Sequence, residues 1–480
     1  MRIRNALVLL LLTVGALFVH GYHPWVEDAE IYLPAAEKII NPALFPFNTQ
    51  FFESHAHLTF FPELIAASVR WSHLPLAWVL FFWQMASMFL LLWAGWELSG
   101  QCFTSLRARW ASVTLLASVF TIPVAGTALY IMDQYVNPRN LTAFAGVLAI
   151  SSVLEKKFVR VLLFLVFAAA LHPLMAVFAS SFCACLVLLP YLDRGRALTA
   201  SLIPLGLFSP VTAAYHQVAL SHGYFYLTRW HWYEWLGALA PLLIFFWYSR
   251  VARSRGLYNL ELLCRAAVVY ELVYIPVALI VSVSGRFETL ARLQPMRSLH
   301  LVYILFFLVI GGLLGEFVLK NRIWRWVTLF LPLCGGMFLA QRALFPASSH
   351  VEWPWAASRN PWVQAFEWVR NNTPADAMFA LNPYHMHIPG EDENGFRAVA
   401  ERSMLADAVK DAGAVTMFPP NAEEWLRQVE AQKNWQNFQA QDFRRLQSQY
   451  GVNWVVLQVP GGEGLDCPYR NAAAMVCRIE

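Results

Sequence analysis

The sequence predicts a polytopic α-helical membrane protein that carries a small α/β domain at its C-terminal end. The 480 residues are 58% hydrophobic and 14% charged, and the mean hydropathy is +0.45, which excludes a disordered chain and an ordinary soluble protein. Residues 1–345 carry 24 Lys and Arg against 15 Asp and Glu, whereas residues 346–480 carry 11 against 16. We therefore expect a basic membrane domain over 1–345 and an acidic, water-soluble domain over 346–480.

About eleven apolar segments are candidates for transmembrane helices, two or three of them short. They are 5–20, 75–97, 110–128, 140–155, 158–172, 174–192, 198–218, 233–249, 260–283, 298–318 and 326–344. The first segment follows Arg2 and Arg4 and is not followed by a small-x-small cleavage site. We interpret it as an uncleaved signal anchor.

The basic residues of the membrane domain predict its orientation. With the N-terminus in the cytoplasm, 15 of the 24 fall at cytoplasmic helix ends and eight on the outer side, as the positive-inside rule requires. Loop 21–74 and the C-terminal domain are then extracytoplasmic. In that compartment Cys467 and Cys477 either form a disulfide or remain two free thiols, and the sequence leaves both alternatives open. The other five cysteines have no metal-binding spacing and fit packing positions.

Local patterns predict the elements outside the membrane. In loop 21–74, helical spacing over 28–40 predicts a helix lying on the membrane, and 60–69 fits a second interfacial helix. The C-terminal domain alternates helical and strand-like stretches. The expected elements are a helix at 362–371, a strand at 377–381, one or two helices within 422–446, and strands at 452–459 and 474–479.

An acidic cluster, Glu27, Asp28 and Glu30, directly follows the first apolar segment. Charges are costly beside a bilayer, so carboxylates crowded there mark a functional site. They can bind a divalent cation, or divide the roles of base and ligand. The alternative is that Asp28 is a helix N-cap. Capping needs one carboxylate only, so we favour function.

Two further polar residues are expected on the outer side. Asp133 is the acid of the second outer loop and either completes a metal or sugar site with the first loop or forms a turn. His172 stands where two short apolar segments meet, before Pro173. It either binds a substrate hydroxyl or phosphate or is a polar residue tolerated at a helix break, and the second interpretation is slightly favoured.

Three arginines, Arg286, Arg292 and Arg297, crowd one outer loop. Bases on that side work against the insertion bias. Because the guanidinium fork suits phosphate, they predict a phosphate or pyrophosphate site near the headgroups. A solvated loop paired with anionic lipid or with the acids of the C-terminal domain is the equal alternative.

These features together resemble the GT-C glycosyltransferases, integral membrane enzymes that take sugars from polyprenyl-phosphate donors. The resemblance is closer to a bacterial multi-pass family of that type. It rests on an acidic motif after the first helix, about eleven helices, and an extracytoplasmic α/β domain. The matching stretches are Gly21 to Pro24 with Glu27-Asp28, Leu171 to Met175, Met296 to His300, and Phe396 to Ser403.

The resemblance implies roles for the acids. Asp28 is the expected general base, or a metal-proximal acid, that activates the acceptor hydroxyl, and Glu27 or Glu30 assists. The motif reads Glu-Asp-Ala-Glu and not a plain Asp-Asp or Asp-Glu pair, so which acid is the base stays open. Metal use varies in the superfamily. A divalent cation, Mg²⁺ or Mn²⁺, would be held by Asp28 and Glu30.

It also implies that the three loop arginines hold the lipid phosphate and stabilise the leaving group. The expected activity is transfer of a hexose or pentose from a polyprenyl phosphate to an extracytoplasmic acceptor, in the bacterial inner membrane and without nucleic acid. A first alternative is a lipid or solute transporter with Glu271 as coupling acid. A second is a non-catalytic scaffold whose C-terminal domain recruits partners.

A dense charged stretch in the C-terminal domain has two open interpretations. It covers the active site or binds the acceptor, or it is a salt-bridged surface. Its members are Arg397, Glu401, Arg402, Asp407, Lys410 and Asp411.

Overall fold

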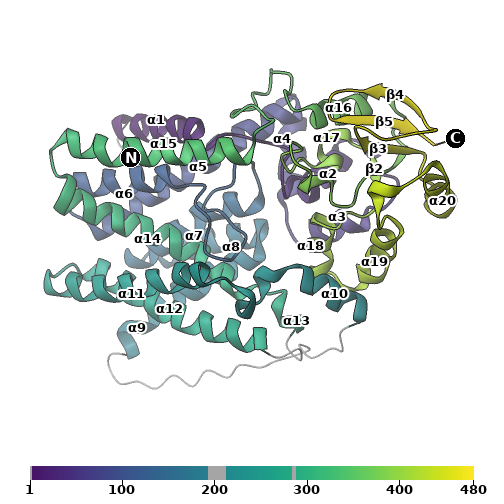
Figure 1. Ribbon diagram of the computed structural model, residues 1–480. Coiled ribbons are helices and arrows are strands. Elements are labelled where there is room, and N and C mark those ends of the chain that lie inside the picture. Colours follow the sequence, from purple (N-terminus) through teal and green to yellow (C-terminus); the bar gives the residue numbers. More distant parts are fainter. Residues whose placement is uncertain (1–2, 193–211, 284–287, 480) are drawn as a thin grey trace.

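The computed structural model describes residues 3–192, 212–283 and 288–479 (Figure 1). Long helices fill one side of the molecule, and a yellow β-sheet with its covering helices fills the other (Figure 1). By length and composition, seven described helices could cross a membrane. They are α1 (Ile3–His20), α5 (Leu76–Cys102), α9 (Pro173–Leu192), α11 (Trp232–Ser254), α12 (Tyr258–Val283), α14 (Leu299–Leu313) with its flanking turns, and α15 (Ile323–Leu344).

Three shorter helices, α6 (Leu106–Ser118), α7 (Pro138–Leu154) and α8 (Phe158–Leu171), coincide with further predicted segments. The predicted segment 198–218 lies largely outside the described residues. Apolar side chains turn outward on the long helices: in α15, Leu331 is 69% and Leu339 is 67% exposed. Such a surface is stable against lipid rather than water.

Loop 21–74 forms three helices, α2 (Ala29–Ile40), α3 (Gln50–Ala56) and α4 (Phe61–Ser72). The two predicted helices are therefore confirmed, and α3 is additional. The prediction that this helix, α2, lies on the membrane is wrong. Its residues from Ala29 to Glu37 are all buried, because α4, α3 and two helices of the C-terminal region, α17 (Phe396–Ala400) and α18 (Lys410–Met417), pack on it.

The C-terminal region contains a five-stranded sheet in the order β2-β1-β3-β5-β4. β1 pairs in parallel with β2 and β3, while β5 pairs antiparallel with β3 and β4. The strands are β1 (Met378–Ala380), β2 (Ser403–Met404), β3 (Trp454–Gln458), β4 (Asp466–Arg470) and β5 (Ala474–Arg478). The predicted strands β1, β3 and β5 are confirmed. The sequence did not show β2, which is two residues long, or β4, whose side chains stay largely exposed.

Alternate side chains of the central strands face two different cores. Val456 and Val476 face α16 (Pro361–Asn372), and Val455 faces α20 (Ala440–Tyr450). These helices and α19 (Ala422–Ala431) match the predicted ones. A disulfide joins Cys467 to Cys477, linking β4 to β5. The shorter helices α10 (Ala213–Ser221) and α13 (Glu288–Ala291) complete the described α-helices.

Main-chain hydrogen bonds tie the segment after α1 to the C-terminal region. The amide of Tyr22 donates to His350 O at 3.0 Å, and the amide of Glu27 donates to Glu393 O at 2.9 Å. The amide of Gly395 donates in turn to Trp25 O at 2.8 Å. These bonds hold the acidic cluster between the long helices and the sheet.

Candidate active site

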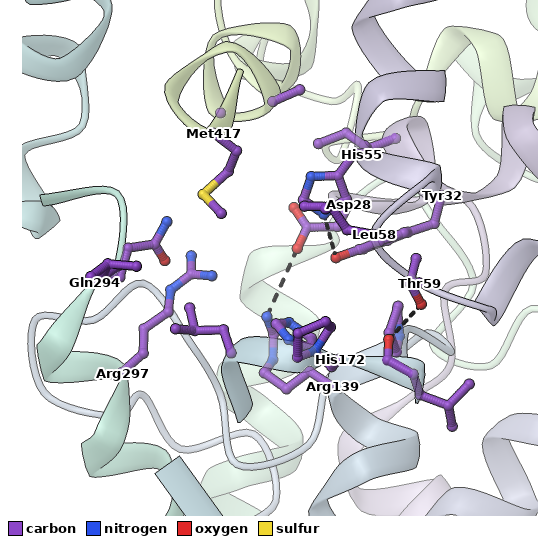
Figure 2. A pocket seen from close by; sticks show the side chains of 18 of the residues that line it. Asp28, Tyr32, His55, Leu58, Thr59, Arg139, His172, Gln294, Arg297 and Met417 are labelled. Carbon is purple, nitrogen blue, oxygen red and sulfur yellow. Dashed lines mark hydrogen bonds and ion pairs between the residues drawn. The ribbon is translucent and has the colours of Figure 1, made fainter. Parts of the chain in front are cut away.

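Asp28 lies at the N-cap position of α2, yet its side chain makes no capping hydrogen bond. Its Oδ1 is 3.2 Å from Lys410 Nζ, and its Oδ2 is 3.9 Å from Arg139 Nη1. The side chain keeps 29% of its surface exposed. In Figure 2 the carboxylate points toward the open space of a pocket. The N-cap interpretation therefore does not account for this side chain.

Arg139 is held toward Asp28 by the loop that precedes α7. Asn137 caps α7 by accepting from Asn140 N at 2.9 Å, which places Arg139 in the first turn. Arg139 Nη2 donates to Asp133 Oδ2 at 2.6 Å, and Asn137 Nδ2 donates to the same oxygen at 2.7 Å. Arg139 thus links Asp133 to Asp28, and its side chain is 5% exposed.

Two cavities meet at Asp28. One, of about 320 Å³, is apolar and is lined by Leu58, Leu171, Leu174, Val177, Leu293 and Met417. The other, of about 480 Å³, is the more polar of the two and is called the polar cavity below; its lining includes Glu27, Asp133, Gln217, Tyr384, Glu393 and Lys410. Both cavities are lined by Asp28, Ile31, Arg139, Tyr224, Arg297 and Gly413. The carboxylate and two guanidinium groups therefore stand where an apolar space joins a polar one.

Of the three loop arginines, the structure places Arg297 at this junction. Arg297 lies in the turn before α14, its guanidinium 5.6 Å from the centre of the Tyr224 ring. In Figure 2 it extends into the same space that Asp28 faces. Arg292 lines neither cavity, and Arg286 lies outside the described residues.

Two histidines stand in the wall of the apolar cavity. His172 lies between α8 and α9 with Pro173 at the start of α9, so it occupies both a helix break and a cavity wall. His55 Nε2 is 3.0 Å from Tyr32 Oη. Burial lowers the pKa of His55 to about 4 and lowers the pKa of His172 well below its usual value. Both imidazoles are therefore neutral hydrogen-bonding groups at neutral pH.

Opposing effects act on the pKa of Asp28. Burial raises it, and the guanidinium groups of Arg139 and Arg297 pull it down, with a net rise above the usual value. A carboxylate with a raised pKa is a stronger base than an ordinary aspartate, provided that it stays ionised. The nearby cations favour that ionised form.

The acidic cluster divides into two groups. Glu27 forms an ion pair with Lys410 and lines the polar cavity. Glu30 is fully buried and turns away: its Oε1 accepts from Arg397 Nη1 at 3.1 Å, and its Oε2 accepts from Ala398 N at 3.2 Å. The structure thus brings Asp28, Glu27 and Asp133 together but leaves Glu30 outside both cavities.

The residues present do not fit a divalent cation on Asp28 and Glu30. The two oxygens of Asp28 face an ammonium and a guanidinium, and those of Glu30 accept from Arg397 and a main-chain amide. Within 3–192, 212–283 and 288–479, no three His, Cys, Asp or Glu side chains are placed to share an ion. A Mg²⁺ or Mn²⁺ ion would have to displace cations already paired with these carboxylates.

The charged stretch of the C-terminal region is not a salt-bridged surface. Arg397, Asp407 and Asp411 are buried, and Arg397 Nη2 donates to Asp411 Oδ2 at 2.7 Å. Arg402 donates to the carbonyls of Arg370 and Thr373 at 2.8 and 2.7 Å, and Glu401 pairs with Arg370 at 3.8 Å. Lys410 is the member of the stretch that lines one of the two cavities at Asp28.

Sequence reasoning missed Arg139 and did not separate Lys410 from its neighbours. The available signal for Arg139 was its place close to the end of an apolar segment, six residues after Asp133 and two after the capping Asn137. Glu271 lies buried in α12 and lines neither cavity. Its carboxylate oxygens have no hydrogen-bond partner among the described residues.

No family model matches the sequence, and no curated protein matches it. Among solved structures, the chain is similar to the archaeal oligosaccharyltransferase AglB from Archaeoglobus fulgidus in complex with an inhibitory peptide and a dolichol-phosphate. The TM-score is 0.43 at 12% identity, over 94% of this chain and 69% of that one. A second is the A. fulgidus oligosaccharyltransferase tethered to an acceptor peptide, with a TM-score of 0.44 at 12% identity, over 95% and 69%.

Proposed function

We propose that the protein is a membrane glycosyltransferase that moves a sugar from a polyprenyl-phosphate carrier to an extracytoplasmic acceptor. One observation carries this proposal: Asp28 and two guanidinium groups stand where an apolar and a polar cavity meet. A lipid-phosphate sugar has the same three parts, an apolar chain, an anion and a polar group. The apolar cavity, the guanidinium groups and the polar cavity follow one another in the same order as these three parts of the donor.

The donor would lie across the junction. The leucines and valine of the apolar cavity suit the first isoprene units, whose burial is favourable by about 25 cal/mol per Å². Arg139 and Arg297 suit the phosphate, because guanidinium groups bind phosphate oxygens with paired hydrogen bonds. The sugar would then face the polar cavity, beside the carboxylate of Asp28.

The residues then divide the reaction. The Asp28 carboxylate takes the proton of the acceptor hydroxyl as the acceptor oxygen forms a bond to the anomeric carbon. The bond between that carbon and the phosphate oxygen breaks, and its electron pair stays on the phosphate. Arg139 and Arg297 stabilise that growing negative charge. Asp133 keeps Arg139 in place through its 2.6 Å hydrogen bond.

We further propose that residues 1–345 form the membrane domain and that 346–480 is an extracytoplasmic domain that completes the site. The distribution of basic residues supports this orientation. The Cys467–Cys477 disulfide supports it as well, because disulfides persist in oxidising compartments. A bacterial inner membrane with a cytoplasmic N-terminus is the corresponding location.

The test is native mass spectrometry of purified protein with polyprenyl phosphate and a polyprenyl-phosphate sugar. The samples are the wild type, Asp28→Asn, and Glu63→Gln as a matched control, an exposed acid of the same outer loop that lines neither cavity. We expect all three to bind the carrier, and sugar loss with acceptor present in the wild type and Glu63→Gln only. Absence of carrier binding in all three would overturn the proposal.

A further inference from the structure

Lys410 reaches the acidic motif from the C-terminal region. It is the first residue of α18, and its ammonium contacts Glu27 and lies 3.2 Å from Asp28 Oδ1. The side chain is 14% exposed and lines the polar cavity. A cation on one part of the chain thus bridges two consecutive carboxylates on another.

Buried groups hold the start of α18 through several hydrogen bonds, and these position the Lys410 side chain. Asp407 Oδ1 accepts from the amides of Val409 and Lys410 at 2.7 and 2.5 Å. Asp411 is bound by both terminal nitrogens of Arg397, at 3.0 and 2.7 Å. The backbone on both sides of Lys410 is therefore fixed to buried groups.

Electrostatics explains why a cation is needed at this point. Two carboxylates on consecutive residues repel each other, and the repulsion is strong where water is partly excluded. Repulsion would favour the protonated form of Asp28, which cannot act as a base. Burial lowers the pKa of Lys410 to about 7, and the two carboxylates in contact with its Nζ favour the ammonium form. That ammonium offsets the repulsion and fixes the orientation of the Asp28 carboxylate.

We infer that Lys410 is a positioning residue that keeps Asp28 ionised and oriented and occupies the place of a divalent cation, so that transfer needs no divalent metal. The inference rests on the proposed function in one respect: it takes sugar transfer as the reaction that Asp28 serves. It adds that the membrane part cannot act alone, because the C-terminal region supplies the cation. It also assigns Glu27 a role, as the second carboxylate that holds the ammonium.

The first test measures Mn²⁺ binding by electron paramagnetic resonance of the free ion, and it needs no substrate. We expect the purified wild type to leave added Mn²⁺ free. We expect Lys410→Ala to bind one equivalent, and Lys410→Ala with Asp28→Asn to lose it. Stoichiometric binding by the wild type that disappears in Asp28→Asn would overturn the inference, as would a Lys410→Ala variant that binds none.

The second test measures sugar transfer in EDTA for the wild type, Lys410→Met and Lys410→Arg. Lys433→Met, which removes an exposed lysine of the same region, is the matched control. We expect the wild type and the control to remain fully active. We expect Lys410→Met to lower kcat about 10²-fold with little change in the donor KM, and Lys410→Arg to recover part of it. Wild-type kcat in Lys410→Met would contradict the inference.

The two tests separate the inference from the proposed function. If the protein transfers no sugar from any polyprenyl carrier, the proposed function fails, while the Mn²⁺ measurement still reports whether Lys410 fills the cation position. If transfer occurs but is lost in EDTA and restored by Mn²⁺, the proposed function stands and the inference fails. Thermal unfolding of each variant shows whether it is folded.

Discussion

Asp28 and Glu30 are two residues apart, yet the structure gives them opposite surroundings. Asp28 is 29% exposed, faces two cavities, and stands near an ammonium and a guanidinium. Glu30 is fully buried and bonded to Arg397 and a main-chain amide. The first arrangement leaves a carboxylate open to a ligand. The second arrangement leaves the Glu30 carboxylate inaccessible to a ligand, and it is called the closed carboxylate below.

The start of α2 causes this difference. Asp28 is the last residue before the helix, and Glu30 lies in its first turn, so their side chains leave the axis in different directions. Glu30 points at α17, where Gly395 leaves room for it: a Cβ there would lie 2.5 Å from Glu30 Oε2. One carboxylate therefore serves the site, and its neighbour fastens the C-terminal region to the first loop.

The largest expected effect tests the open carboxylate. Asp28→Asn keeps the shape of the side chain and removes the base, so kcat for sugar transfer should fall by about 10²–10⁴-fold. The melting temperature should stay near that of the wild type, because the side chain is partly exposed and makes no cap. Steady-state kinetics and thermal unfolding measure the two effects. Retained turnover would remove Asp28 as the base.

The closed carboxylate predicts the reverse outcome. Arg397→Met leaves Glu30, Asp407 and Asp411 buried without their guanidinium, and removal of one partner from a buried pair costs roughly 3–5 kcal/mol. The variant should unfold at a clearly lower temperature or fail to accumulate. Arg427→Met, at a surface arginine whose side chain is 71% exposed, is the control. An unchanged melting temperature in Arg397→Met would refute a fastening role for this cluster.

A smaller effect concerns the loop arginines. Arg297 lines both cavities and Arg292 lines neither, although both were expected to hold the phosphate. Arg297→Ala should raise the KM for the lipid donor roughly tenfold, the loss of one charge-assisted hydrogen bond of about 1.5 kcal/mol or more. Arg292→Ala should leave it unchanged. Equal donor kinetics in the two variants would separate this loop from the donor site.

Local patterns in the sequence predicted the elements well and their contacts poorly. The helices after Asp28 and at 362–371, and the strands at 377–381 and 474–479, follow from periodicity and breakers. The direction of Glu30 and its pairing with Arg397 do not, because the two residues are 367 positions apart. Nothing in a local pattern specifies such a contact.

The distinction between local patterns and distant contacts also explains which site residues could be predicted. Asp28, Asp133, His172 and Arg297 could be selected because each is a polar residue close to the end of an apolar segment, where charge is costly. Lys410 lies in a polar stretch of the C-terminal region, where a lysine is ordinary. Its importance comes from contacts with Glu27 and Asp28, more than 380 positions away.

The smallest expected effect is a pH dependence that belongs to the closed carboxylate. Glu30, Asp407 and Asp411 share the guanidinium of Arg397, and burial raises the pKa of Glu30 to about 8 and that of Asp411 to about 6. The folded state therefore binds more protons than the unfolded chain between the ordinary pKa of Glu, 4.5, and about 8. Stability is then highest below this range and falls as the pH rises through it.

We expect the loss between pH 6 and 8 to be on the order of 1 kcal/mol, seen as a falling melting temperature. Glu30→Gln removes the titrating proton but keeps a group that can face Arg397, so it should flatten the slope. Asp28→Asn should change the slope less than Glu30→Gln does, because the Asp28 side chain keeps 29% of its surface exposed whereas Glu30 is fully buried. The comparison between the two acids would break down if both substitutions altered the slope equally, since the pH dependence would then belong to the site.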